Sequence, residues 1–512
     1  MSDNSISNNN RIAKNTIALY FRMLFTMAVS LYTSRVILNT LGVVDYGINN
    51  VVGGIVAMFA FINGAMVTST QRYLTYGLGR GDIKKLQEVF SSSIYVHMGI
   101  SIVVVLLAET VGMWFFYEKM VIPAEPITAA MWVFQLSILT MVVNVMSVPY
   151  NSAIVAHEKM SAFAMISVVE VVLKLLIVYM LVIGNFDKLK LFAVLTACLS
   201  LLIRFIYTQY SHRHFIETRH VLRPNFSLIK EMGQFAGWNI WGNMAAMLFG
   251  TGINMLLNVF FGPVVNAARA IAVQVETAIV QFSTNFLLAV NPQITKLYAQ
   301  NNLKEMHSLI FRASKFSCFL LFAMSLPIIL ETNTILILWL KIVPDYTVSF
   351  IRLLLCIIIV DSMARPLMIA AAATGDVKLY QSVIGGILLL IVPIAYIVLR
   401  LGGNPTSVYV VYLTISILAF WTRLIIIRPM IKLSIREFVV KALFRSLLVC
   451  VVSFLLTYAL KCVVPSGTVW SLFICLISLL TVLVLAYTIG LSSNERSFVN
   501  EKCASLLGKI KK

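Results

Sequence analysis

Fourteen apolar runs, each of roughly 20 residues or more, follow one another along this 512-residue sequence. A run of about 20 apolar residues is long enough to cross the hydrocarbon core of a bilayer as a helix. We therefore predict an all-α integral membrane protein with about 14 transmembrane helices. The predicted spans cover residues 15–39, 47–71, 90–116, 127–153, 162–184, 190–210, 234–260, 264–292, 309–339, 347–372, 380–400, 406–427, 440–462 and 468–490.

The composition agrees with this class and excludes several others. Sixty per cent of the residues are hydrophobic and only 12% are charged, whereas soluble domains carry about 25% charged residues. The seven cysteines are scattered, without a CxxC pair or a histidine at metal-binding spacing, so we predict neither a metal site nor a redox site. We assign the net charge of +19 to loop topology and expect no nucleic-acid partner.

The basic residues predict the orientation of the chain. If the N-terminus is cytoplasmic, the cytoplasmic segments hold 22 lysines and arginines and the opposite side holds 3. Such an asymmetry is the positive-inside pattern of membrane proteins. The basic C-terminal tail then lies on the same side as the N-terminus, which requires an even number of crossings. We predict that both termini are cytoplasmic.

An internal repeat relates the two halves of the chain. GDIKKLQEVFSSS (81–93) aligns with NNLKEMHSLIFRAS (301–314) at an offset of about 220 residues. MSVPYNSAIVA (146–156) resembles MARPLMIAAAA (363–373) at an offset of 217. The near agreement of the two offsets predicts two six-helix lobes. Because six is even, both lobes enter the membrane from the same side and are parallel repeats.

The repeat divides the chain into six predicted regions. The last two spans have no counterpart in the repeat and are almost wholly apolar, so we interpret them as lipid-facing accessory helices. The regions are a cytoplasmic N-terminal tail (1–14), an N-lobe of spans 1–6 (15–210), a cytoplasmic linker (211–233), a C-lobe of spans 7–12 (234–428), the accessory spans 13 and 14 (429–490) and a basic cytoplasmic tail (491–512).

Polar side chains form stripes on spans 2, 7 and 8, which include corresponding members of the two predicted lobes. Small and polar residues on one helix face also serve helix packing, and that alternative stays open for each stripe. The placement in both lobes favours a wet cleft instead. The predicted lining residues are Asn49 of span 2, Asn239, Asn243 and Asn254 of span 7, and Gln274 and Gln281 of span 8.

Arginines within the spans are the candidate ligand-binding groups. Arg22 lies roughly 12 Å along its helix from Lys14, too far to reach the interface easily. Arg35 and Arg269 lie nearer the outer interface. A guanidinium within a bilayer costs a few kcal/mol, so such residues usually face a partner or a watery cavity.

The remaining charged residues have structural interpretations. Glu170 with Lys174, and Asp361 with Arg365, are spaced four residues apart and can neutralise one another on one helix. Arginines close to predicted cytoplasmic span ends are expected to reach out to the interface: Arg72, Arg204 and Arg423. Glu276 shares a face with Arg269. Glu276 and Asp361 are the candidates for binding a coupling ion, either a proton or sodium.

Four segments carry a resemblance to a family: LNTLGVVDYGINN, TQRYLTYGLGRGDIKKLQEVF, VPYNSAIVAHEKM and AAATGDVKLYQS. They resemble the bacterial polysaccharide-transport proteins, the Wzx-type flippases of O-antigen, capsule and exopolysaccharide repeat units. These proteins belong to the superfamily (MOP) that also contains the multidrug and toxin extrusion transporters (MATE). The resemblance spans about residues 10–430.

The resemblance implies a MATE-like arrangement of two lobes and alternating access, not an enzyme. It implies an undecaprenyl-diphosphate-linked oligosaccharide as cargo and the bacterial inner membrane as location. It matches the family's cavity cations to Arg22, Arg35 and Arg269. A polysaccharide polymerase and a chain-length regulator are possible partners besides membrane lipids, and the protein is expected to be a monomer without a cofactor.

Two alternatives stay open. A drug or cation antiporter of the same superfamily would need a buried acid in the N-terminal lobe, where span 1 offers arginines and no acid. An integral-membrane polymerase or acyltransferase would need a large outer loop or a catalytic His/Asp pair, and neither stands out. A diphosphate carries about two negative charges, and fixed guanidiniums bind phosphate in bidentate geometry. The charge pattern therefore favours the lipid-diphosphate cargo.

Overall fold

The structure is a computed structural model of the whole chain. It describes residues 15–30, 32–33, 36–37, 40–41, 60–118, 127–181, 187–340, 343–465, 467–493, 495–497 and 500. Throughout these ranges the regular structure is helical, and no strand occurs in them. Arg35 and Asn49 lie outside the described residues.

Twelve helices in the described ranges are long and apolar enough to cross a membrane. They coincide one by one with the predicted spans 3 to 14. The chain is therefore a multi-pass membrane protein, as the sequence predicts. Predicted span 1 is described as helical over residues 15–30, and predicted span 2 is described only in its second half, within α2.

The chain divides into two compact units. Unit 1 comprises residues 1–244, 288–302 and 375–378, and unit 2 comprises 245–287, 303–374 and 379–512. The division passes through α8 (Phe226–Phe261) and α9 (Pro263–Ala299), so each of these two helices contributes to both units. The predicted linker 211–233 is short in space, because α7 extends to His214 and α8 begins at Phe226.

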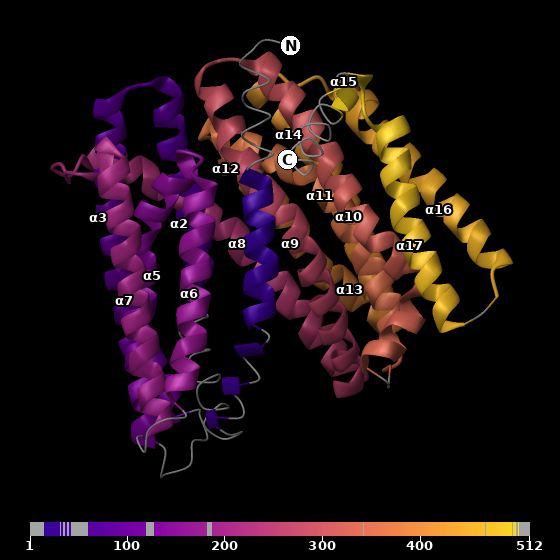
Figure 1. Cartoon of the computed structure of the whole chain (residues 1–512), viewed down its shortest axis with the longest axis horizontal. Coiled ribbons are helices and arrows are strands. Elements are labelled where there is room, and N and C mark those ends of the chain that lie inside the picture. The colour runs from indigo at the N-terminus through magenta and orange to yellow at the C-terminus, as the bar shows by residue number, and fades with distance from the viewer. Residues whose placement is uncertain are drawn as a thin grey trace, which may run out of the picture. The chain divides into compact units, whose positions relative to one another are not determined.

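Unit 1 is a bundle built around α5, drawn from indigo to magenta in Figure 1. Helices α2, α3 and α7 pack against α5, and α6 packs against α7. Asp82 and Asp187 cap α3 and α7 by accepting hydrogen bonds from main-chain amides three residues ahead, at Lys85 and Lys190. The helices of this unit are α2 (Ala60–Arg80), α3 (Ile83–Leu107), η1 (Ala108–Gly112), α4 (Met113–Glu118), α5 (Ile127–Ala156), α6 (Met160–Met180), α7 (Lys188–His214) and η2 (Ile216–Thr218).

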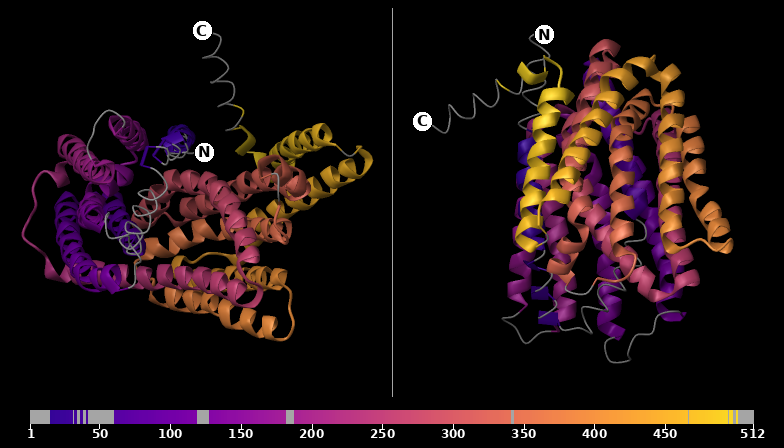
Figure 2. Two further views of the ribbon diagram at one scale, coloured as in Figure 1. Left: turned by 90° about the horizontal axis from the view of Figure 1, so that it is seen from below. Right: turned by 90° about the vertical axis from the view of Figure 1, so that its right-hand side faces the viewer.

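Unit 2 is centred on α10, which packs against α11 and α17, while α14 packs against α11. The most apolar window of α10 is 67% buried, against 22% in α16 and in α17, so α10 is central and the last two helices are peripheral. Figure 2 shows α16 and α17 as the yellow hairpin at the edge of this unit. Its other helices are α10 (Leu303–Leu340), α11 (Thr347–Thr374), α12 (Lys378–Leu389), α13 (Ile391–Arg400), α14 (Pro405–Ile431), α15 (Ile435–Phe438), η3 (Val439–Phe444), α16 (Arg445–Val463), α17 (Thr468–Leu485) and η4 (Ala486–Gly490).

Left-handed residues recur at the two offsets of the predicted repeat. The turn after α5 places Glu158 at φ +59°, and the turn after α11 places Gly375, 217 residues later, at φ +85°. The turn after α2 places Gly81 at φ +73°, and the turn after α9 places Asn301, 220 residues later, at φ +57°. Non-glycine residues adopt this region infrequently. The agreement therefore supports the internal repeat independently of side-chain similarity.

Candidate functional site

A network of charged side chains occupies the interior of unit 2. Asp361 of α11 forms an ion pair with Arg423 of α14, with an Oδ1 to Nη1 distance of 3.5 Å. The Arg423 side chain is only 7% exposed. Arg365, one turn after Asp361 on α11, donates a hydrogen bond of 3.3 Å to Oγ1 of Thr284 on α9. The aspartate thus has its ion pair with a different helix.

This pairing corrects two sequence-based interpretations. Arg423 was expected to reach the membrane interface, but it is buried beside Asp361. Asp361 and Arg365 were expected to neutralise one another as a structural pair on one helix. They interact electrostatically, yet the ion pair within 4 Å is the one from Asp361 to Arg423. Helical spacing identifies neighbours on one helix, whereas Arg423 approaches from α14.

Arg269 of α9 is held against α8 by two hydrogen bonds. Its Nη2 donates to the carbonyl oxygen of Gly250 at 2.8 Å, and its Nη1 donates to Oδ1 of Asn254 at 3.4 Å. Asn254 and Arg269, which were predicted separately as lining residue and cavity cation, are therefore neighbours. The guanidinium is half-buried.

Glu276 connects these groups. It lies two turns after Arg269 on α9 and is half-buried. It interacts electrostatically with Asp361, Arg269 and Arg365. The network therefore contains three arginines and two acids, distributed over α9, α11 and α14. With both acids ionised, it has an excess of one positive charge.

The predicted lining amides fall into two groups. Asn243, Asn254, Gln274 and Gln281 are exposed in the structure. Asn239 differs, because it is only 6% exposed and donates a hydrogen bond of 2.8 Å to the carbonyl of Phe235, one turn earlier on α8. Its amide therefore does not line a cavity.

In unit 1, Arg22 packs against two helices. Its guanidinium carbon lies 4.9 Å from the ring centroid of Phe163 on α6, the geometry of a cation–π contact. Glu170 of α6 and Tyr207 of α7 interact with it electrostatically. Arg22 is thus a half-buried cation inside a membrane-spanning bundle, with one acid in its surroundings.

Sequence reasoning missed a second charged cluster in unit 1. Glu158 in the turn after α5 is 4% exposed; its Oε1 lies 2.6 Å from Nζ of Lys296, and its Oε2 accepts a 2.5 Å hydrogen bond from Gln293. Nδ2 of Asn15 donates to the main-chain carbonyl of Glu158 at 3.1 Å. The sequence signal was available in hindsight, because this turn sits at the repeat position of Gly375.

Arg72 of α2 is buried where exposure was expected. It is 9% exposed, and its guanidinium lies over the rings of Tyr73, Tyr76 and Phe235, with 4.4 to 5.5 Å between the guanidinium carbon and the ring centroids. It also lies against Gly375, where a Cβ would be 2.3 Å from Nη2. Aromatic packing within unit 1 therefore replaces the predicted reach to the interface.

Solved structures of transporters share this fold. No protein-family model matches the sequence, and no curated protein matches it. An outward-facing multidrug resistance MATE family transporter of the MOP superfamily matches with a TM-score of 0.68 at 13% identity, covering 82% of this chain and 96% of that one. A MATE in the straight conformation matches with a TM-score of 0.67 at 14% identity, covering 83% and 97%.

A third match is a MOP superfamily transporter from Pyrococcus furiosus, with a TM-score of 0.67 at 13% identity and coverage of 82% and 96%. Its reported binding pocket has reversed polarity, which was taken to suggest a different function. The chain is thus an all-helical membrane protein with the MATE-like fold that the sequence predicts.

Proposed function

We propose that this protein is a flippase that moves an undecaprenyl-diphosphate-linked oligosaccharide across the bacterial inner membrane. The cargo passes from the cytoplasmic to the periplasmic leaflet by alternating access, and both termini of the chain are cytoplasmic. The oligosaccharide serves as a repeat unit of a cell-surface polysaccharide. The fold shared with MATE transporters supports membrane transport as the activity.

The charge balance within the membrane-spanning bundles carries this proposal. In unit 2, Arg269, Arg365 and Arg423 face two acids, which leaves one positive charge in excess. In unit 1, Arg22 stacks on Phe163. A diphosphate carries about two negative charges, and guanidinium groups suit phosphate oxygens through paired, charge-assisted hydrogen bonds. The Pyrococcus furiosus structure indicates that pocket polarity varies within this fold.

The exposed amides suit the sugar part of the cargo. Asn254, Gln274 and Gln281 present side chains with both donors and acceptors. Polar groups that face lipid are costly, so amides exposed on membrane-spanning helices favour a water-filled surface. Sugar hydroxyl groups can exchange for that water with matching hydrogen bonds.

A cation or drug antiporter is the second candidate, and Glu276 is the observation that favours it. This half-buried acid interacts with Asp361 as well as with the arginines, an arrangement that suits binding of a proton or sodium ion. In a flippase the same two acids would bind the coupling ion. The two functions therefore differ in the role of the arginines, because a cationic drug has no use for them.

Reconstitution into proteoliposomes separates the two candidates. We expect the purified protein to move a fluorescent undecaprenyl-diphosphate oligosaccharide between leaflets. Arg22→Ala and Arg269→Ala should reduce this flipping at least tenfold at unchanged protein abundance, whereas the exposed Arg400, which stacks on Tyr396, serves as control. Drug-coupled cation transport that depends on Glu276 but not on these arginines would overturn the flippase in favour of the antiporter.

A further inference from the structure

The central helix of unit 2 is broken near its C-terminal end. Glu331 of α10 has non-helical dihedrals, with φ −112° and ψ 29°, one turn after Pro327. Proline lacks an amide hydrogen and distorts the turn before it, so a break here has a local cause. A broken helix leaves main-chain carbonyl groups without their intrahelical partners.

Side chains from four helices compensate for this break. Thr332 returns its hydroxyl to the carbonyls of Ile328 and Ile329, at 2.5 and 3.2 Å. Nε of Arg352 on α11 donates to the Ile329 carbonyl at 3.0 Å, and the Cys475 thiol on α17 contacts the Pro327 carbonyl at 3.9 Å. The carbonyl of Leu330 accepts a hydrogen bond from Lys461 on α16.

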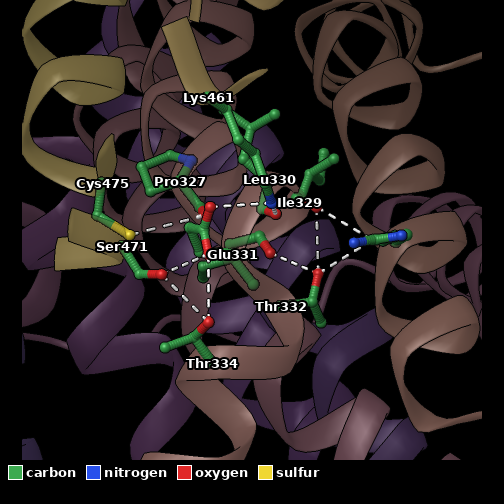
Figure 3. Close-up of polar contacts among 11 residues, drawn as sticks. Pro327, Ile329, Leu330, Glu331, Thr332, Thr334, Lys461, Ser471 and Cys475 are labelled. Atoms are coloured by element: carbon green, nitrogen blue, oxygen red, sulfur yellow. Dashed lines mark hydrogen bonds and ion pairs between the residues drawn. The ribbon is translucent and has the colours of Figure 1, made fainter. Parts of the chain in front are cut away.

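Glu331 itself is buried among donors. Its side chain is 6% exposed, and its Oε1 lies 2.9 Å from Nζ of Lys461. Its Oε2 accepts hydrogen bonds from Ser471 of α17 at 2.8 Å and from Thr334 at 3.2 Å. Figure 3 shows Lys461 reaching down to Leu330 and Glu331, with Ser471 and Thr334 approaching the carboxylate from the other side. The hydroxyl groups of Thr334 and Ser471 also lie 3.3 Å apart.

The ammonium of Lys461 thus sits at a discontinuous helix, between a carboxylate oxygen and a freed carbonyl oxygen, with two hydroxyl groups next to the carboxylate. In discontinuous membrane helices, carbonyls of unwound turns and helix ends are ligands for monovalent cations such as sodium. Oxygen ligands of this kind suit a hard cation. The groups around Nζ are those of a small cation site.

We propose that the break in α10 is a monovalent-cation site whose resident cation is the tethered ammonium of Lys461. The accessory hairpin α16–α17 supplies this cation, so it completes unit 2 as well as covering its lipid-facing side. Leu326 and Leu330 of α10 pack with Ile474 and Val482 of α17 in one buried cluster, which holds the hairpin in place beside the break. Without the ammonium, the carboxylate and carbonyl would take up sodium from solution.

Thermal unfolding of the purified full-length protein in detergent tests this assignment. Lys461→Ala should lower the unfolding midpoint by on the order of 5–10 °C in choline chloride, because it leaves a buried carboxylate without its partner. Sodium chloride at equal ionic strength should restore most of this loss. Lys441→Ala is the matched control, since Lys441 pairs with Glu437 at 2.6 Å on the surface, with side chains 58% and 53% exposed.

Cation selectivity decides the outcome. Equal recovery in choline and sodium, no recovery in sodium, or wild-type stability of Lys461→Ala would each overturn the proposal. The double variant Lys461→Ala, Glu331→Gln removes the charge that attracts the ion and should be insensitive to sodium. If Lys461→Ala does not accumulate, accumulation of this double variant supports the cation requirement of the carboxylate, and its failure to accumulate overturns it.

Discussion

Lys296 and Glu158 form a buried ion pair that joins the C-terminal end of α9 to the turn between α5 and α6. The Nζ to Oε1 distance is 2.6 Å, and the glutamate side chain is 1% exposed. Glu158 holds this position although its φ of +59° is unusual for a residue with a Cβ atom. The ion pair and the Gln293 hydrogen bond therefore outweigh the backbone strain at this turn.

Breaking this pair should destabilise unit 1. Lys296→Met leaves a buried carboxylate without a counter-charge, a change that costs about 3–5 kcal/mol in folded proteins. Adding Glu158→Gln should recover most of that loss, because it removes the uncompensated charge. Unfolding midpoints of the two single variants and the double variant measure the coupling. Additive effects of the two substitutions would contradict a direct ion pair.

The turn after α11 allows a matched comparison of two glycines. Gly375 at φ +85° lies against Arg72, and Gly402 at φ +91° has open space around its α-carbon. Alanine at Gly402 should cost about 1–2 kcal/mol from the left-handed backbone alone. Alanine at Gly375 should cost clearly more, because its Cβ would be 2.3 Å from Nη2 of Arg72. Equal losses of thermal stability would show that the Arg72 side chain moves aside freely.

The membrane-spanning helices could be predicted because length and hydropathy are properties of the sequence itself. Spans 3 to 14 were confirmed, and α9 and α10 continue through Pro292 and Pro327, where a helix end was as plausible as a kink. The repeat was predictable for a similar reason. Its two copies need the same turns, and the left-handed residues at 158 and 375 preserve that requirement.

The partners of charged residues were not predictable in the same way. Asp361 was paired with Arg365 from helical spacing, but its ion pair is with Arg423. Arg72 was expected at the interface, but rings from α2 and α8 enclose it. Such contacts join residues far apart in the sequence, and one sequence without packing information does not select among them. The broken helix at Glu331 was missed for that reason too.

The C-terminal segment should loosen at acidic pH. Burial alone would raise the pKa of Glu495, but hydrogen bonds from Lys315 and from the Ser492 amide outweigh it and hold the pKa below its ordinary value of 4.5. A depressed pKa means that the stabilisation is complete above the unfolded value and is lost as the pH falls through the folded value. Limited proteolysis after α17 should therefore accelerate below pH 4.5.

Glu495→Gln is the control for this pH effect. Lys315 is 3% exposed, so the variant leaves a buried ammonium without its carboxylate at every pH. We expect rapid proteolysis of this variant already at neutral pH, with little further change on acidification. A pH profile identical to that of the wild type would assign the acid response to other groups.

The exposed amides of α8 should be accessible to water. Single cysteines replacing Asn243 and Asn254 in a cysteine-free background should react with a small hydrophilic thiol reagent, because both side chains are exposed. Cysteines at Ala245 and Leu256 should react at least tenfold more slowly. Ala245 is 1% exposed, and Leu256 packs against the hydrophobic core of unit 2. Neutral hydrophobic reagents should label exposed positions whether they face lipid or water, so comparing the two reagents separates these environments. Equal inertness of Asn243 and Asn254 toward the hydrophilic reagent would assign their amides to helix packing or lipid contact and remove them from the proposed sugar-binding surface.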